Sequence, residues 1–121
     1  MERSLIAIVD DDDLVRSATV SLLRSMDYEC CAFASADDFL RDTDCRYQCV
    51  VSDIQMPGMS GIELARLLAS RVPPPPVILI TAYADAAALA ARASGLIVDM
   101  IEKPLDSHAF LAALQAALAG R

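Results

Sequence analysis

Short apolar runs along the chain alternate with stretches in which apolar residues recur every three or four positions. The runs have the length of buried strands and predict β-strands at 5–9, 28–33, 49–52, 77–80 and 97–101. Helical spacing follows each run and predicts helices at about 14–26, 36–40, 61–71, 86–94 and 110–118. This alternation predicts an α/β fold, a doubly wound five-stranded parallel sheet with five helices on both faces.

Residues that start or stop helices support these boundaries. Ser35 and Asp85 are suitable N-caps, and Ser60 with Glu63 has the spacing of a capping box. The four prolines at 73–76 end the third helix and predict a rigid loop before the fourth strand.

The size and charge of the chain narrow the class of protein. Its 121 residues predict one domain, 1–121. Mean hydropathy is positive, but the longest stretches without Asp, Glu, Lys or Arg are shorter than the roughly 18 residues of a membrane span, so we expect no membrane association. A net charge of −7 argues against direct nucleic-acid binding by this chain. Because the N-terminus lacks a secretory signal pattern, we expect a cytoplasmic protein.

Cysteine and histidine give little indication of a metal site. Cys30, Cys31, Cys45 and Cys49 lack CxxC spacing, and the single histidine, His108, is distant from them in sequence. We expect free thiols and an exposed histidine on the last helix.

Polar residues follow four of the predicted strands at their carboxyl ends. Asp10 and Asp11 follow the first strand, Asp53 the third, Thr81 the fourth and Lys103 the fifth. Ligands of doubly wound sheets bind beyond these ends, so the side chains are expected to meet at one rim. Three carboxylates, a hydroxyl and an ammonium suit a hard cation together with an oxyanion. Lys103 is also the only lysine in the chain.

Simpler interpretations exist for some of these residues. The aspartates at 10–13 could form a solvated loop in which Asp13 caps the first helix, and the sequence alone leaves the register within this run open. Thr81 could be an ordinary strand residue, because threonine is a good strand former. Chance could account for the position of Lys103.

Four segments, 8–16, 51–61, 80–82 and 101–104, resemble in order and spacing the receiver domain of two-component response regulators. They contain an acidic pair, the pattern D-x-x-M-P-x-M-S-G, a strand-ending threonine and a Lys-Pro pair. The subtype is similar to receivers found ahead of helix-turn-helix transcriptional effectors. The resemblance covers the whole chain and implies a flavodoxin-like sheet of strand order 2-1-3-4-5.

The resemblance implies a metal site. In this family the acidic pair directly follows the last apolar residue of the first strand, which selects Asp10 and Asp11 from the run. Mg²⁺, for which Mn²⁺ could substitute, would be bound by these two carboxylates, by Asp53 and by the backbone carbonyl of Gln55.

The resemblance also implies a covalent switch. Asp53 would accept a phosphoryl group from a sensor histidine kinase, and Lys103 and Thr81 would contact the phosphoryl oxygens. Thr81 and Met100 are the expected switch residues. Met100 replaces the Tyr or Phe that is usual in the family, so we expect altered coupling to the output surface. Tyr83 is expected to shield the phosphoryl group from water.

The same resemblance implies partners and a route for the signal. These are the sensor histidine kinase, an output domain that is C-terminal or separate, and homodimer contacts through the fourth helix, fifth strand and fifth helix. The fourth helix has Leu89 as its only large apolar residue, so we expect it to be loosely anchored. We expect a signalling switch that catalyses only its own phosphorylation and dephosphorylation, not an enzyme.

Three alternatives remain open at this point. A Mg²⁺-dependent phosphatase would also use an aspartyl nucleophile, but it usually has an acid two residues later, where this chain has Gln55. A nucleotide-binding domain would have a glycine-rich loop after the first strand, where this chain has aspartates. The third alternative is a receiver-like interaction module that works without phosphorylation, which the replacement at Met100 keeps open.

Overall fold

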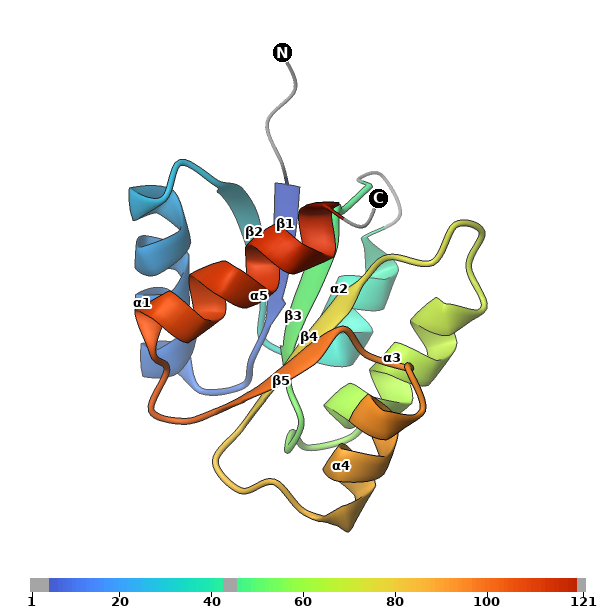
Figure 1. Cartoon of the computed structure of the whole chain (residues 1–121). Helices are drawn as coiled ribbons and strands as arrows, with labels where there is room; N and C mark the ends of the chain where they lie inside the picture. Colours follow the sequence, from blue (N-terminus) through green and yellow to red (C-terminus); the bar gives the residue numbers. More distant parts are fainter. Residues whose placement is uncertain (1–4, 43–45, 120–121) are drawn as a thin grey trace.

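The computed structural model describes residues 5–42 and 46–119, and its elements alternate regularly between strand and helix (Figure 1). Their order is β1 (Leu5–Val9), α1 (Asp13–Ser25), β2 (Glu29–Phe33), α2 (Ala36–Arg41), β3 (Cys49–Asp53), α3 (Gly61–Ala69), β4 (Val77–Thr81), α4 (Ala86–Ala93), β5 (Asp99–Glu102) and α5 (Ser107–Ala119). All strand pairs are parallel and the sheet order is β2-β1-β3-β4-β5. The predicted fold class and strand order are confirmed.

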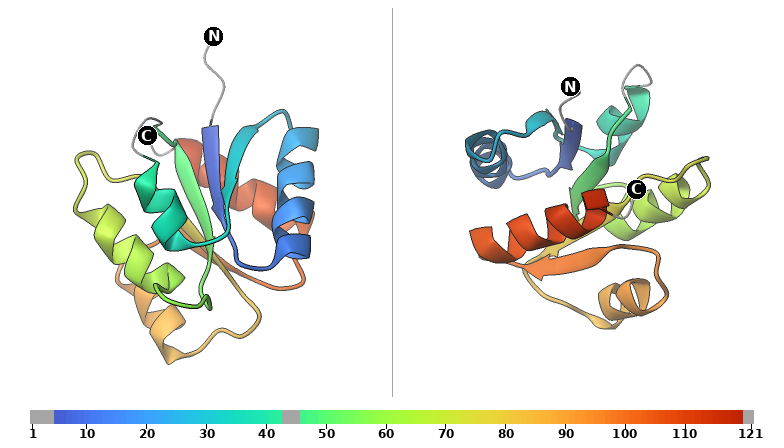
Figure 2. Two further views of the ribbon diagram at one scale, coloured as in Figure 1. Left: turned by 180° about the vertical axis from the view of Figure 1, so that it is seen from behind. Right: turned by 45° about the horizontal axis from the view of Figure 1, so that its top comes forward.

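Helices cover both faces of the sheet, α1 and α5 on one and α2, α3 and α4 on the other (Figures 1 and 2). Each strand contributes side chains to the core on both faces of the sheet, because successive side chains point to opposite faces. In β4, for example, Leu79 packs towards α2, α3 and α4, whereas Ile78 and Ile80 pack with Phe110 and Leu114 of α5. Continuous apolar strands therefore fit the central positions of this sheet.

The first helix differs from the sequence interpretation at two points. Asp12, not Asp13, is the N-cap, and its carboxylate accepts hydrogen bonds from the backbone N–H groups of Leu14 and Val15. Leu14 lies outside the core with 84% of its surface exposed, although it belongs to the helical apolar pattern. The buried residues of α1 are Thr19 and Leu23, and burial of Thr19 is tolerated because its hydroxyl donates to the Val15 carbonyl at 2.8 Å.

The fifth strand begins two residues later than its apolar run. Ile97 is buried in the core but precedes the ladder, which begins where Asp99 pairs with Ile78. The chain reaches this strand through a turn in which Gly95 has a φ of +80°, a conformation that glycine adopts readily. The apolar run at 97–101 therefore contains a buried loop residue, Ile97, as well as residues that pair in the sheet.

The predicted caps of the other helices are confirmed. Ser35 caps α2, Ser60 and Glu63 form a capping box at α3, and Asp85 caps α4. The α4 helix is held by small side chains, since its buried residues are Ala88 and Ala91 and Leu89 is 52% exposed.

The remaining expectations concern the surface and the cysteines. Cys30 and Cys31 are half-buried free thiols, and burial raises the pKa of Cys30; Cys45 lies outside the described residues. His108 is exposed on α5, as expected. Among residues 5–42 and 46–119, no helix combines the length and apolar character that a bilayer crossing requires.

Candidate functional site

Three carboxylates from two strand ends meet at the carboxyl edge of the sheet. Asp10 follows β1, Asp11 comes next in the chain, and Asp53 is the last residue of β3; their carboxylate oxygens lie within 4.8 Å of one another. Asp10 and Asp53 are 3% and 7% exposed, whereas Asp11 is open to solvent. The structure thus brings together the two aspartates nearest the strand with Asp53.

Burial and charge make this cluster electrostatically unfavourable without a cation. Burial of Asp10 raises its pKa, and the neighbouring carboxylates of Asp53 and Asp11 add to the increase. A hydrogen bond from the backbone N–H of Asp12 to Asp10 Oδ1, at 2.9 Å, acts in the opposite direction, as does the charge of Lys103. Hard carboxylate oxygens at this separation suit a divalent ion such as Mg²⁺, so the donor set fits the metal implied by the sequence.

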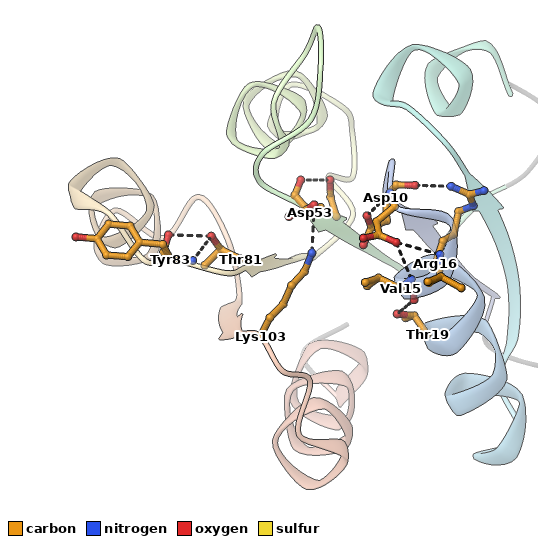
Figure 3. Close-up of polar contacts among 11 residues, drawn as sticks. Asp10, Val15, Arg16, Thr19, Asp53, Thr81, Tyr83 and Lys103 are labelled. Carbon is orange, nitrogen blue, oxygen red and sulfur yellow. Dashed lines mark hydrogen bonds and ion pairs between the residues drawn. The ribbon is translucent and has the colours of Figure 1, made fainter.

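Lys103 brings positive charge to the cluster from the far side of β4. Its Nζ lies 3.4 Å from Asp53 Oδ2, and Figure 3 shows the side chain reaching across to Asp53. The backbone anchors it, because the Lys103 N–H donates to the Thr81 carbonyl at 2.7 Å. The following peptide bond, Lys103–Pro104, is cis.

The loop between β3 and α3 holds Asp53 by close backbone contact. Gly61 donates its N–H to the carbonyl of Ile54 at 2.9 Å, which brings the start of α3 against the end of β3. A Cβ atom at position 61 would lie 2.3 Å from the Asp53 carbonyl oxygen, so only glycine fits there. The Ser52 hydroxyl donates to the same Asp53 carbonyl at 2.9 Å.

Thr81 lies at the end of β4, but its hydroxyl is engaged elsewhere. Its Oγ1 donates to the carbonyl of Tyr83 at 2.8 Å and accepts from the Tyr83 N–H at 3.1 Å. Figure 3 shows this pair on the side of Lys103 remote from Asp10, with the Tyr83 ring directed away from Asp53. In this conformation the Thr81 hydroxyl is hydrogen-bonded to Tyr83 and not to Asp53, and the Tyr83 ring does not cover Asp53.

Two further candidates have ordinary surroundings. Met100 is half-buried in β5 and packs against the core on the side of α2, α3 and α4. Gln55 is exposed in the loop that follows Asp53. Met100 therefore occupies space between the sheet and the α4 layer, and Gln55 keeps its side chain in solvent.

Arg16 and Gly61 are site residues for which the sequence reasoning assigned no role. Arg16 donates to the Asp10 carbonyl at 2.8 Å and pairs with the Asp13 carboxylate. A signal for the ion pair was present, because Arg16 lies three residues after Asp13 on a helix. For Gly61 the signal was glycine at the start of a helix directly after its cap. The contact with the Asp10 carbonyl depends on tertiary structure and had no sequence signal.

Comparisons with known proteins agree on one family. The family model described as "Response regulator receiver domain" matches residues 6–115. The chain is 37% identical over 117 residues to the transcriptional regulatory protein TdiR of Thauera aromatica, covering 96% of this chain and 52% of the relative. It is 38% identical over 113 residues to the transcriptional regulatory protein FixJ of Azorhizobium caulinodans, covering 92% and 53%. The chain thus spans about half the length of these curated relatives.

Solved structures show the same similarity in three dimensions. The crystal structure of FixJ-N aligns with a TM-score of 0.87 and 33% identity, covering 100% of this chain and 98% of the other. The signal receiver domain of an HD domain-containing protein from Pseudomonas fluorescens Pf-5 aligns with a TM-score of 0.91 and 26% identity, covering 98% and 97%.

Proposed function

Because the chain belongs to the response regulator receiver domain family, whose members are phosphoacceptor signalling switches, we propose that Asp53 is the phosphoacceptor of this one. The observation that carries the proposal is the position of the Asp53 carboxylate between the acidic cluster and the single lysine, 3.4 Å from Lys103 Nζ. An aspartate in that position has an anion-neutralising partner on one side and ligands for a cation on the other.

We propose that Mg²⁺ is held by the carboxylates of Asp10, Asp11 and Asp53 and by the backbone carbonyl of Gln55. The chemistry that the ion supplies when bound is neutralisation of the negative charge on the carboxylates and on the incoming phosphoryl oxygens. The fit is supported by the carboxylates that converge within 4.8 Å and by the raised pKa of Asp10. Mn²⁺ prefers the same oxygen ligands and would substitute.

In the transfer step, an oxygen of the Asp53 carboxylate forms a bond to phosphorus while the P–N bond of a phosphohistidine breaks. The electron pair of that bond stays with the imidazole, which leaves as the other product. Lys103 gives up its contact with Asp53 and pairs with a phosphoryl oxygen, because the new group carries more negative charge than the carboxylate did. Positioning and charge therefore supply the rate enhancement.

The switch would involve the β4–α4 loop. The Thr81 hydroxyl must give up its donation to the Tyr83 carbonyl before it can donate to a phosphoryl oxygen. Met100 packs against the core on the side of α2, α3 and α4, and its flexible side chain would move into or out of that space as the loop moves. The α4 helix can follow at low cost, since only Ala88 and Ala91 are buried.

The partners are proposals of the same kind. A sensor histidine kinase would supply the phosphoryl group. The chain would catalyse only its own phosphorylation and dephosphorylation. The curated relatives are about twice as long as this chain and are named as transcriptional regulators, which supports an output domain as the second partner.

Intact mass spectrometry after incubation with acetyl phosphate and MgCl₂ tests the proposal. Wild-type chain is expected to gain the mass of one phosphoryl group, and both Asp53→Ala chain and wild type in EDTA are expected to gain none. Asp37→Ala, which removes an exposed carboxylate at the start of α2, is the matched control and should be modified like wild type. Equal modification of Asp53→Ala and wild type would reject Asp53 as the acceptor.

A further inference from the structure

Arg16 projects from α1 back to the end of β1. One guanidinium nitrogen donates to the backbone carbonyl of Asp10 at 2.8 Å, and another pairs with the carboxylate of Asp13. The side chain is largely buried, at 21% exposure. Figure 3 shows it on the side of Asp10 opposite Asp53, so it does not reach the place where a phosphoryl group would sit.

The carbonyl that Arg16 holds belongs to the peptide that joins Asp10 to Asp11. Fixing this peptide fixes the direction in which the chain leaves the strand, and with it the starting points of both carboxylates. The loop has other constraints, since the Asp10 N–H donates to the Phe33 carbonyl at 3.0 Å and the Asp12 N–H donates to Asp10 Oδ1 at 2.9 Å. Arg16 supplies the tether at the carbonyl, which neither of those bonds provides.

A guanidinium suits this task better than an ammonium would. Its planar group presents several N–H donors in a fixed arrangement, so it can bind a carbonyl and a carboxylate at once without losing much side-chain freedom for each bond. The positive charge of Arg16 by itself weakens metal binding, because a cation near the carboxylates lowers their attraction for Mg²⁺. The two effects of Arg16 on metal affinity therefore have opposite signs.

We propose that Arg16 is a positioning residue of the metal site, which strengthens Mg²⁺ binding by holding the Asp10–Asp11 peptide in the orientation that directs both carboxylates towards Asp53. The inference rests on the proposed metal site at Asp10, Asp11 and Asp53. Removing a group that hydrogen-bonds to a metal ligand and orients it commonly lowers metal affinity 10- to 100-fold. Arg16 orients the ligands through the backbone.

Isothermal titration of the chain with MgCl₂ tests the inference. Arg16→Gln is expected to bind Mg²⁺ about tenfold more weakly than wild type. Arg16→Lys keeps the opposing charge and loses the simultaneous contacts with both partners, so it is also expected to bind Mg²⁺ more weakly than wild type. The matched control is Arg41→Gln, which removes the same charge from an exposed pair with Asp38 on α2 and should bind Mg²⁺ as wild type does.

The direction in which Arg16→Gln changes the affinity for Mg²⁺ distinguishes a positioning role from an effect of charge alone. If Arg16 acted through charge alone, Arg16→Gln would bind Mg²⁺ more tightly than wild type and Arg16→Lys would bind it equally well. A purely structural role would lower the melting temperature equally with and without Mg²⁺ and leave the dissociation constant unchanged. Either result would overturn the inference. Should Arg16→Gln fail to fold, Arg16→Lys decides: weaker Mg²⁺ binding than wild type supports the inference and wild-type affinity overturns it.

Failure of the proposed metal site would look different. In that case wild type would show no heat of Mg²⁺ binding, or Asp11→Asn would bind Mg²⁺ as tightly as wild type. That result overturns the proposed site and the role of Arg16 together. Mg²⁺ binding that is intact in wild type, lost in Asp11→Asn and unchanged in Arg16→Gln would overturn the role of Arg16 alone.

Discussion

Lys103 Nζ lies 3.4 Å from Asp53 Oδ2, although the two residues are 50 positions apart and their strands, β5 and β3, are separated by β4. The contact pairs the one lysine of the chain with a carboxylate that is nearly buried. Because Lys103 reaches over the end of β4, the pair depends on a strand order that places β3 and β5 on either side of β4.

Loss of this ammonium should slow phosphorylation of the chain. Lys103→Ala is expected to lower the rate of modification by acetyl phosphate about 100-fold, the usual effect of removing one group that stabilises developing charge. Arg41→Ala removes the same charge from an exposed site and serves as the control. A Lys103→Ala rate within about threefold of the control would contradict the assigned role.

Neutralising Asp10 should stabilise the metal-free chain. Burial raises the pKa of Asp10 in the folded state, so the folded chain binds a proton more tightly than the unfolded chain. This group's contribution to stability therefore declines as pH rises from the ordinary aspartate range through the raised folded value. At neutral pH in EDTA, Asp10→Asn is expected to melt at a higher temperature than wild type, since Asn Oδ1 can still accept from the Asp12 N–H.

The order should reverse when metal is added. Mg²⁺ is expected to raise the melting temperature of wild type and to have little effect on Asp10→Asn, because a bound ion stabilises only the state that binds it. Melting curves in EDTA and in excess MgCl₂ measure both effects. Equal Mg²⁺-dependent shifts in the two chains would show that Asp10 is not a ligand.

The two glycines around the β3–α3 loop should respond differently to substitution. Gly61→Ala places a Cβ 2.3 Å from the Asp53 carbonyl oxygen, a backbone atom, and is expected to lower the free energy of unfolding by about 3 kcal/mol. Gly58→Ala meets no atom within 4 Å and has only the strain of a positive φ, about 1 kcal/mol. Urea denaturation compares them, and equal losses would argue against the close contact.

The α4 helix should exchange its amide protons faster than its neighbours do. Its buried side chains are alanines and its ion pair with β5, Arg92 to Asp99, is partly exposed, so local opening exposes little apolar surface and costs little free energy. Native-state hydrogen exchange is expected to show weaker protection at 86–93 than at 61–69 of α3. Protection of α4 equal to that of β4 would remove the basis for an easily displaced output surface.

In the unphosphorylated chain, the Thr81 hydroxyl should stabilise the β4–α4 loop through its hydrogen bonds to Tyr83. Thr81→Val removes the hydroxyl that holds Tyr83, and is expected to cost about 1 kcal/mol of stability and to speed exchange of the Tyr83 amide. Thr81→Ser retains the hydroxyl and should keep the Tyr83 amide protected. Unchanged protection in Thr81→Val would indicate that these hydrogen bonds do not hold the loop.

Local sequence patterns predicted the elements well where burial and strand pairing coincide. The range 5–9 was predicted for the first strand and is β1, because every apolar residue there pairs in the sheet. Ile97 was misassigned to the fifth strand because it is buried ahead of the ladder. In α1 the core contains Thr19, whose hydroxyl is satisfied by its own helix, whereas Leu14 is exposed, a difference that hydropathy does not reveal.

The rim of the sheet could be predicted because parallel strands end on one side. This placed Asp10, Asp11, Asp53 and Lys103 together. The sequence could not give the direction of the Thr81 hydroxyl, which depends on the conformation of the next two residues. Nor could it reveal that Arg16 supports the Asp10 carbonyl, because that contact forms only when α1 is docked.

Locating the phosphoryl group on a single residue tests the assignment of Asp53 as the phosphoacceptor. After treatment with acetyl phosphate and MgCl₂, sodium borohydride reduces an aspartyl phosphate to homoserine, which peptide mass spectrometry can place on a single residue. Homoserine is expected at position 53 only, and none is expected when MgCl₂ is replaced by EDTA. Homoserine at position 10 or 11, or a phosphoryl adduct with no homoserine at position 53, would contradict it.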